Sequence, residues 1–250
     1  MISLNLIIQS NDSMKYIIPF LAICLVFSCK PAEQSVDSIN ELTKAEKAAG
    51  WQSLFDGQSM DGWHGYNKET TGSVWSASDG AIHRDTTSGE VGDIVTDEEY
   101  EDFELMLEWK IQDCGNSGIF WSVVEDESVD RVYKTGPEMQ VLDNKCHPDA
   151  KIRTHRSGDL YDMIESSEEN VKPAGEWNSV RIKSKNAAME LWQNGTVVVS
   201  FSMHTPEWNA MVADSKFKNM ALFGKAKKGH IALQDHGDEV WFRNIKIRRL

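Results

Sequence analysis

The feature that most constrains the fold of this chain is segment 103–111, in which apolar and polar residues alternate without a break. The apolar set is Phe103, Leu105, Leu107, Trp109 and Ile111, and the set between them is Glu104, Met106, Glu108 and Lys110. Because side chains of a β-strand point alternately to opposite faces, this spacing predicts a strand with one buried and one solvated face. Such strands are typical of antiparallel sheets.

Further runs with strand character follow, separated by turn signals. We expect strands at 118–124, 177–184, 196–201, 230–234 and 240–248. The dipeptides Asp56-Gly57, Asp79-Gly80 and Asn194-Gly195 tolerate positive φ and are typical of hairpins.

One segment, 206 to about 217, reads as a helix, with Thr205 as N-cap and Pro206 at the first helical position. Many short strands and one short helix predict an all-β fold. We expect two antiparallel sheets packed as a β-sandwich of jelly-roll type.

The length and charge of the chain limit its organisation and its partners. With 250 residues and 40% hydrophobic content, it can bury one core, so we expect a single domain with a tail. A formal net charge of -13 argues against a nucleic-acid partner, which requires a basic surface.

The N-terminus has the pattern of a targeting signal. Lys15 precedes an apolar run from Tyr16 to Phe27, followed by Ser28 and Cys29. A run of about a dozen residues is shorter than the roughly 20 that span a bilayer as a helix. We predict a lipoprotein signal peptide over 1–29 with lipidation of Cys29, a plain secretory signal being the alternative.

The predicted signal sets the expected location and domain limits. Residues 30–49 are polar and small, which predicts a flexible tether, and the folded domain is expected over 50–250. The protein would then sit in the cell envelope, periplasmic or associated with the outer membrane, and contact the membrane through its lipid only.

Two cysteines fall in the expected domain, Cys114 and Cys146. Outside the cytoplasm they could pair, but the sequence leaves a disulfide and two separate thiols equally open. Neither belongs to a closely spaced pair of the kind that binds metal.

The strongest candidate site is the stretch 136–144, which reads as a strand. Alternation places Glu138 and Gln140 on one face. Asp143 and His147 follow at the strand's end and in the next loop, where functional groups often collect.

Three other segments concentrate polar groups. The glycine-bounded loop 113–119 presents Asn116 and Ser117, either for a structural turn or for a polyhydroxylated ligand. Loop 151–162 is either a functional loop or an ion-paired cover over a sheet; it contains Arg153, His155, Arg156, Asp159, Tyr161 and Asp162.

The third segment, 234–239, begins with Gln234 and joins the last two strands, which places His236 at the rim of the sandwich. A lone rim histidine is usually inert, but neighbouring acids could raise its pKa into the range that suits proton transfer.

Metal binding and aromatic stacking stay open. A divalent metal site is possible, although the ligand spacings are not diagnostic; its candidate ligands are Asp143, His147, His155 and Asp162. We assign packing roles to Trp75, Trp109, Trp177 and Trp241, whereas Trp192 shares its face with Glu190 and could stack on a sugar.

An ordered series of short motifs resembles the DUF1080 family over about residues 50–250. The series comprises Leu54-Phe55-Asp56-Gly57, Gly62-Trp63, Gly115-Asn116-Ser117-Gly118-Ile119, Gln140-Val141-Leu142-Asp143-Asn144, His147-Pro148, Gly158-Asp159-Leu160-Tyr161-Asp162, Gly175-Glu176-Trp177-Asn178, Asn194-Gly195, Gly229-His230-Ile231-Ala232-Leu233-Gln234-Asp235-His236-Gly237 and Phe242-Arg243-Asn244-Ile245. The resemblance implies a jelly roll of the concanavalin A-like lectin/glucanase type. It also implies 3-keto-disaccharide hydrolysis, or 3-keto-glucoside 1,2-lyase and 3-keto-2-hydroxy-glucal hydratase activity.

That chemistry requires a base for the acidified C2 proton of a 3-keto sugar, an acid for the leaving oxygen and donors for the enolate. We expect Glu138 or His147 as base and His236 or Tyr161 as acid. The residues expected to bind hydroxyls or the developing oxyanion are Asn116, Ser117, Gln140, Asp143, Arg156 and Gln234.

Two other functions remain open. Lectin-like sandwiches also bind glycans without reacting, which would make the protein a lipid-anchored carbohydrate-binding module. A conventional glycoside hydrolase would pair Glu138 with a second carboxylate.

Overall fold

The structure, a computed structural model, describes residues 39–87 and 89–250. The predicted signal peptide, its lipidation site Cys29 and the first part of the predicted tether lie outside the described residues. Within the described ranges, no helix is both long and apolar enough to cross a membrane.

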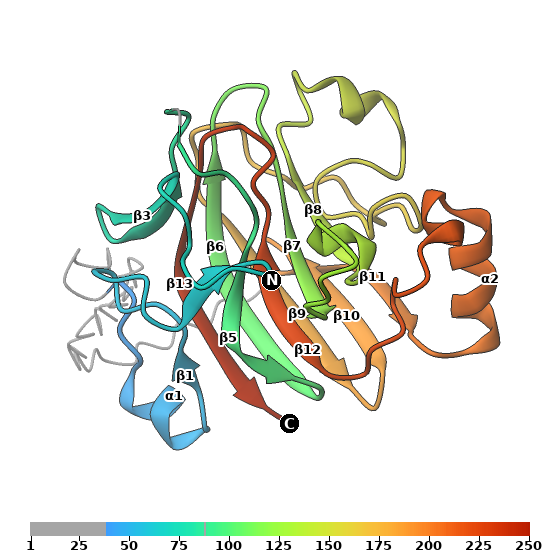
Figure 1. Ribbon diagram of the computed structural model, residues 1–250, viewed down its shortest axis with the longest axis horizontal. Helices are drawn as coiled ribbons and strands as arrows, with labels where there is room; N and C mark the ends of the chain where they lie inside the picture. Colours follow the sequence, from blue (N-terminus) through green and yellow to red (C-terminus); the bar gives the residue numbers. More distant parts are fainter. Residues whose placement is uncertain (1–38, 88) are drawn as a thin grey trace, which may run out of the picture. The chain divides into compact units, whose positions relative to one another are not determined.

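Two antiparallel sheets form the domain (Figure 1). The larger sheet contains β1 (Gln52–Ser53), β3 (Trp75–Ser78), β4 (Ala81–Arg84), β6 (Phe103–Ile111), β9 (Asn178–Lys185), β10 (Ala188–Gln193), β11 (Thr196–Ser202) and β13 (Val240–Arg249). Its order is β11-β10-β9-β6-β13-β4-β3, and β1 pairs with β13.

The smaller sheet contains β2 (Trp63–Gly65), β5 (Ile94–Tyr100), β7 (Asn116–Val123), β8 (Glu138–Leu142) and β12 (Gly229–Leu233), in the order β2-β5-β12-β7-β8. One buried cluster joins Leu105 and Ile247 of the larger sheet to Ile119, Val141 and Leu233 of the smaller sheet. The predicted two-sheet β-sandwich is therefore confirmed.

Strand β6 follows the predicted alternation, with its apolar set buried and Met106, Glu108 and Lys110 partly exposed. Glu104 departs from the pattern because it is buried. It forms ion pairs with Arg181 and Arg248 from the two neighbouring strands, so its charge is compensated across the sheet.

Two of the three predicted hairpin turns are confirmed. Asp79-Gly80 joins β3 to β4 with φ of 51° and 73°, and Asn194-Gly195 joins β10 to β11 with φ of 48° and 88°. The prediction for Asp56-Gly57 is wrong, because it connects β1 and β2, which belong to different sheets. The Asp56 carboxylate instead accepts from the backbone N–H groups of residues 58 and 59, both over 2.7 Å.

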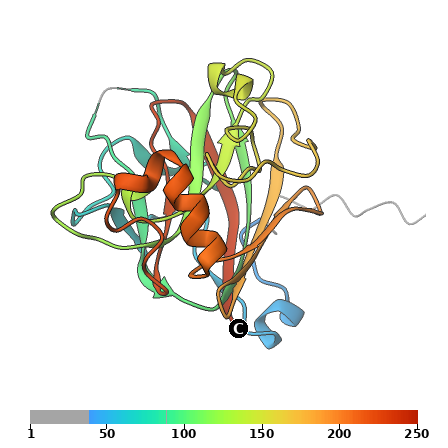
Figure 2. The same cartoon turned by 90° about the vertical axis from the view of Figure 1, so that its right-hand side faces the viewer.

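Helix α2 (Pro206–Asp214) begins as predicted, and the Thr205 hydroxyl accepts from the backbone N–H of Trp208 over 3.2 Å. It ends earlier than expected, because extended Ser215 starts the 3₁₀ helix η4 (Lys216–Asn219). The buried Trp208 packs α2 onto the domain, and Figure 2 shows the helix on the side facing the viewer. The other helical elements are α1 (Lys44–Ala48), η2 (Val132–Lys134) and η3 (Pro148–Lys151).

The described end of the predicted tether contacts the domain. Asn40 exchanges two 2.7 Å backbone-to-side-chain hydrogen bonds with Asn244, and Glu46 of α1 pairs with Lys246 on β13. These contacts place α1 against the larger sheet.

The tryptophans with predicted packing roles are found in two environments. Trp75 and Trp109 are buried in the core. Trp177 and Trp241 are partly exposed, and the Lys110 ammonium lies 5.2 and 4.2 Å from their ring centroids.

Candidate active site

Strand β8 carries the central residue of the candidate site at the edge of the smaller sheet. It pairs with β7 on one side, and residues 158–161 cover its other edge. The backbone N–H of Gln140 donates to the carbonyl of Asp159 over 3.1 Å, and that of Tyr161 donates to the carbonyl of Glu138 over 3.1 Å. Met139 and Val141 point into the core, as the alternation predicted, which leaves Glu138 and Gln140 on the other face.

A cavity of about 130 Å³ opens on that face. It is lined by Asn116, Tyr133, Glu138, Gln140, Tyr161, Lys216, Gln234 and His236. Six of these eight residues were predicted as site residues, and they come from segments far apart in the sequence. Three larger hollows of the described structure, of about 250, 270 and 380 Å³, hold none of the six.

Glu138 is the buried carboxyl group of this cavity. Burial raises its pKa to about 8, the carboxyl groups of Asp93 and Asp149 act in the same direction, and the Lys216 ammonium opposes them. A base is most effective when its pKa lies near the working pH. Glu138 can therefore hold or accept a proton near neutrality, as C2 proton abstraction requires.

Tyr161 stands next to Glu138 and keeps its proton. Burial raises the pKa of its phenol far above the ordinary value, with Asp149 and Glu138 adding to the effect. The hydroxyl donates to the Asp149 carboxylate over 3.4 Å, and the ring stacks on His155 at 4.2 Å between centroids. Such a phenol is a hydrogen-bond donor rather than a ready source of protons.

Lys216 and Tyr133 line the cavity although the sequence analysis did not select them. Lys216 fell inside the predicted helix, where nothing in the pattern distinguishes it from a solvated lysine. Its ammonium lies 3.8 Å from the ring centroid of Tyr161. Partial burial lowers its pKa, and the carboxyl groups of Glu138, Asp162 and Asp149 oppose that effect.

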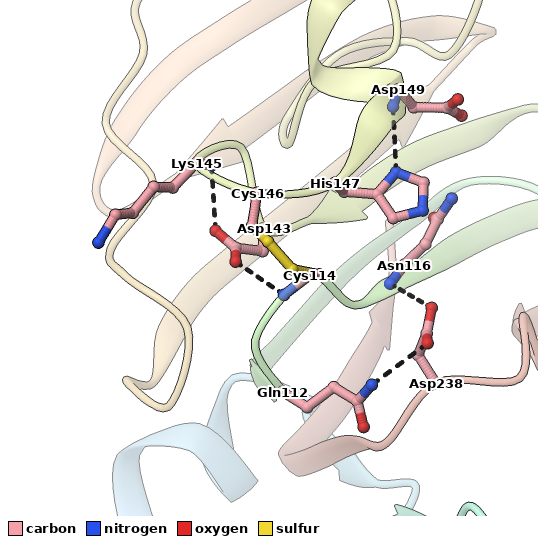
Figure 3. Close-up of a disulfide and its surroundings, with 9 residues drawn as sticks. All are labelled: Gln112, Cys114, Asn116, Asp143, Lys145, Cys146, His147, Asp149 and Asp238. Carbon is pink, nitrogen blue, oxygen red and sulfur yellow. Dashed lines mark hydrogen bonds between the residues drawn. A yellow bond between two sulfur atoms is a disulfide. The ribbon is translucent and has the colours of Figure 1, made fainter.

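The rim of the cavity carries His236. The side-chain N–H of Asn116 donates to its Nε2 over 3.4 Å, and its Nδ1 lies 3.8 Å from the Asp238 carboxylate. Asp238 in turn accepts from the backbone N–H of Asn116 over 2.9 Å and from the side chain of Gln112 over 3.2 Å (Figure 3). This arrangement leaves the lone pair of His236 on Nε2 and its proton facing Asp238.

His147 lies beside His236, with 6.1 Å between ring centroids, but does not line the cavity. Its Nδ1 accepts from the backbone N–H of Asp149 over 3.2 Å at the start of η3 (Figure 3). The proton of the neutral ring is therefore on Nε2, which makes this nitrogen a donor.

A disulfide joins Cys114 to Cys146, with 4.7 Å between Cα atoms, which settles the alternative left open by the sequence. It ties the turn before β7 to the loop that carries His147 (Figure 3). Asp143 braces the same junction, accepting from the backbone N–H of Cys114 over 2.9 Å and of Lys145 over 3.0 Å. Asp143 thus supports the site without lining the cavity.

Two other predicted substrate-binding residues also lie off the cavity. Ser117 is fully buried, and its hydroxyl donates to the carbonyl of Gln234 over 2.9 Å. Arg156 pairs with Glu169 over 2.6 Å and lines a separate hollow. Trp192, on β10 of the larger sheet, lies under the Arg181 guanidinium at 4.8 Å and does not line the cavity either.

The four predicted metal ligands do not come together in the described structure. His155 pairs with Asp162 over 3.0 Å, and Asp143 lies at the disulfide. His147, His236 and Asp238 do offer ligand atoms within 4.8 Å of one another. The hydrogen bond to Nδ1 of His147 leaves its Nε2 protonated, so this arrangement favours hydrogen bonding over metal coordination.

Two buried acceptors of the cavity lack partners within the described residues: Oδ1 of Asn116 and Oε1 of Gln234. Buried polar atoms are normally hydrogen-bonded, so these two oxygens are free to accept from donors on water or on a bound molecule. Sugar hydroxyls are such donors.

The comparison with known families agrees with this site. Residues 50–248 match the 3-keto-alpha-glucoside-1,2-lyase-like domain. The chain belongs to this family. The matched segment covers every cavity residue, and the family resemblance proposed from the sequence motifs is thereby confirmed.

Relatives of the 3-keto-alpha-glucoside-1,2-lyase-like family share both sequence and fold with the chain. A 3-keto-disaccharide hydrolase of Bacteroides thetaiotaomicron is 36% identical over 230 residues, covering 81% of this chain and 79% of the relative. A crystal structure of a candidate glycosyl hydrolase from Parabacteroides distasonis superposes with a TM-score of 0.79 at 32% identity, covering 85% of this chain and 99% of the other.

A more distant neighbour supports the fold alone. A Bacillus subtilis protein of unknown function with a galectin-like fold superposes with a TM-score of 0.50 at 12% identity, covering 84% of this chain and 94% of the other. This likeness agrees with a lectin-type jelly roll.

Proposed function

We propose that this protein cleaves 3-keto-glycosides, by C2 proton abstraction followed by β-elimination and hydration. The observation that carries the proposal is the buried Glu138, whose pKa is raised to about 8 inside a cavity rich in hydrogen-bonding groups. Membership of the family and the similarity to a 3-keto-disaccharide hydrolase support the same class of substrate.

The ketone at C3 makes the neighbouring C2 proton acidic. The Glu138 carboxylate takes this proton, a double bond forms between C1 and C2, and the bond from C1 to the leaving oxygen breaks. The leaving oxygen takes a proton from the enzyme. Water then adds to C1 while C2 regains a proton, so that the net change is hydrolysis of the glycoside.

The sequence left two candidates for the base and two for the acid, and the geometry favours one of each. Glu138 lines the cavity, whereas His147 lies outside it and presents a donor, so Glu138 is the better base. His236 is the better acid, because the pKa of the Tyr161 phenol is strongly raised. For this role Nε2 of His236, which accepts from Asn116 in the structure, must first be protonated, and Asp238, 3.8 Å from Nδ1, would stabilise the resulting imidazolium.

Amide groups would hold the hydroxyls. The unpartnered oxygens of Asn116 and Gln234 accept from them. The Tyr161 hydroxyl, which donates its proton to Asp149, can accept from a further hydroxyl.

Release of a chromogenic aglycone from a 3-keto-glucoside tests the proposal. We expect release by the wild type and a loss of about 10²- to 10⁴-fold in Glu138→Gln, the usual range for a general acid or base. Glu127→Gln, a change at an exposed acid outside the cavity, should retain full activity. Absence of release by the wild type would contradict the proposal. So would release by Glu138→Gln and His236→Ala at the rate of the wild type.

The alternatives give different outcomes with the same reagents. A binding module would bind an unmodified glycan in calorimetry and turn over no keto sugar. A conventional glycosidase would hydrolyse an unoxidised nitrophenyl glycoside. That reaction needs a second carboxylate, and Glu138 is the only carboxyl group among the residues that line the cavity.

We also propose that Cys29 carries a lipid that anchors the protein in the cell envelope. The support is the signal pattern ending in Ser28-Cys29. Labelled palmitate should enter the wild type and not Cys29→Ser, and that variant should leave the membrane fraction. Incorporation by both proteins would contradict the anchor.

A further inference from the structure

Lys216 differs from the other basic groups around the cavity because its ammonium has no direct partner. In the part of the chain that the structure describes, Nζ forms neither an ion pair nor a hydrogen bond. Its contacts are the rings of Tyr161, at 3.8 Å from the centroid, and Phe217, at 5.2 Å. By contrast, the ammonium of Lys134 pairs with Asp130. A cation held over the cavity with no ion pair or hydrogen bond of its own is free to bind a ligand oxygen.

The fold fixes the position of Lys216. Its backbone N–H donates to the Asp162 carboxylate over 2.7 Å, and the other oxygen of Asp162 lies 3.0 Å from Nε2 of His155. The following residue, Phe217, is buried and stacks on Phe223 with 3.9 Å between centroids. Both sides of Lys216 are therefore anchored, and the side chain extends over Tyr161 from a defined point.

The hydrogen-bonding groups of the cavity fall into two sets. Asn116 lies with His236 at the rim, 3.4 Å apart, and offers an unpartnered acceptor. Tyr161 lies with Glu138, joined through the backbone, and Lys216 covers the Tyr161 ring. The first set suits hydroxyl donors, whereas an ammonium only donates.

A 3-keto sugar differs from its parent only at C3, where a ketone replaces the hydroxyl group. A hydroxyl both donates and accepts, but the C3 carbonyl oxygen only accepts, and it becomes negative when C2 loses its proton. A donor-only cation beside the base therefore matches the oxidised carbon. The two sets of groups then orient the sugar, with C3 toward Lys216 and the C1 leaving group toward His236.

We propose that Lys216 recognises the C3 ketone: its ammonium donates to the carbonyl oxygen and stabilises the enolate formed when Glu138 removes the C2 proton. The electron pair of the C2–H bond forms a C2–C3 double bond, the π pair of the carbonyl moves onto the C3 oxygen, and the proton goes to the Glu138 carboxylate. As the enolate collapses, the C3 carbonyl re-forms, the C2–C3 pair becomes the C1–C2 double bond, and the C1–O bond breaks. The inference rests on the proposed function and names the residue that selects oxidised over unoxidised sugars.

Lys216→Met tests this role, and Lys218→Met, at an exposed lysine of the same 3₁₀ helix, is the matched control. Exchange of the C2 proton of a 3-keto-glucoside in D₂O is followed by NMR. Calorimetry compares binding of that ketone with binding of the matched unoxidised glucoside. Thermal unfolding confirms that both variants are folded.

We expect Lys216→Met to slow C2 exchange by about 10²- to 10³-fold, the range found when one oxyanion donor is removed. It should weaken binding of the ketone at least about tenfold and leave binding of the unoxidised glucoside unchanged, while Lys218→Met matches the wild type. Exchange within about threefold of the wild type, or equal weakening of both ligands, would overturn the role of Lys216. If the wild type neither releases the aglycone nor introduces deuterium at C2 of substrate or product, the proposed function fails, and the binding comparison alone decides whether Lys216 selects the ketone.

Discussion

The backbone N–H of Tyr161 donates to the carbonyl oxygen of Glu138 over 3.1 Å, which attaches the loop after β8 to the edge of that strand. This backbone contact brings a phenol and a buried carboxyl group to one cavity. The same loop supplies Asp162, which holds the backbone of Lys216. Strand pairing therefore holds the titratable groups of the site in place. Four consequences of this arrangement and of the disulfide beside it can be measured.

The first consequence concerns the pH dependence of catalysis. If Glu138 is the base, only its ionised form reacts, and burial raises its pKa to about 8. We expect kcat/KM to rise about tenfold per pH unit below that value, as Glu138 ionises, and this rising limb to be absent in Glu138→Gln. pH–rate profiles of the wild type and the variant measure this. A wild-type profile with no rising limb below pH 8 would contradict Glu138 as the base.

The second consequence concerns stability. A carboxyl group whose pKa is higher in the folded than in the unfolded state favours folding below its unfolded pKa of about 4.5, and this advantage is lost as the pH rises toward 8. Glu138→Gln lacks this titration. At pH 8 we expect the free energy of unfolding of the variant, measured with denaturant, to exceed that of the wild type by a few kcal/mol, on the order of the pKa shift of Glu138. Near pH 4 this difference should disappear. If the variant and the wild type differed in stability by the same amount at pH 4 and at pH 8, Glu138 would not be buried as a carboxyl group.

The third consequence concerns Asp238, which faces His236 and holds the backbone of Asn116. Asp238→Asn keeps the shape of the side chain and removes the charge that stabilises the imidazolium. We expect kcat to fall by about tenfold or more. Glu239→Gln is the control, because the neighbouring Glu239 pairs with His83 away from the cavity. Equal losses in both variants would indicate a general effect of charge.

Much of the fold follows from local patterns, because each one reflects a local physical requirement. The alternation in 103–111 fixed which face of β6 is buried, and Asn194-Gly195 supplied the positive φ of its turn. Asp56-Gly57 looked the same in sequence but connects two sheets. Which strands pair is decided by distant contacts, and a dipeptide carries no information about those.

The part of the candidate site that lies on a strand could be predicted from the alternation of polar and apolar residues. Glu138 and Gln140 share the cavity because they alternate with core residues on β8. Lys216 could not be found in this way, because its role depends on a loop that returns to Tyr161. Ser117 and Asp143 have the expected residue types, but their polar atoms are used to hold neighbouring segments together.

The fourth consequence concerns the disulfide between Cys114 and Cys146. The bridge closes a loop with a sequence separation of 32, and loop-closure entropy predicts about 3–4 kcal/mol of stability from it. We expect the double Cys→Ser variant to unfold roughly 10 °C lower, since 1 kcal/mol shifts Tm by about 2–4 °C in domains of this size. Calorimetry with and without reductant measures the effect. A reductant that leaves the wild type unchanged would show that the two cysteines do not pair in solution.

The most direct test of the account is to incubate the wild-type protein with a 3-keto-glucoside in D₂O and to analyse the released sugar by NMR and mass spectrometry. Removal of the C2 proton by Glu138 and its later replacement from solvent predict aglycone release together with one deuterium at C2. Release of an aglycone and a sugar without deuterium at C2 would contradict the proposed mechanism, and absence of release would contradict the proposed activity.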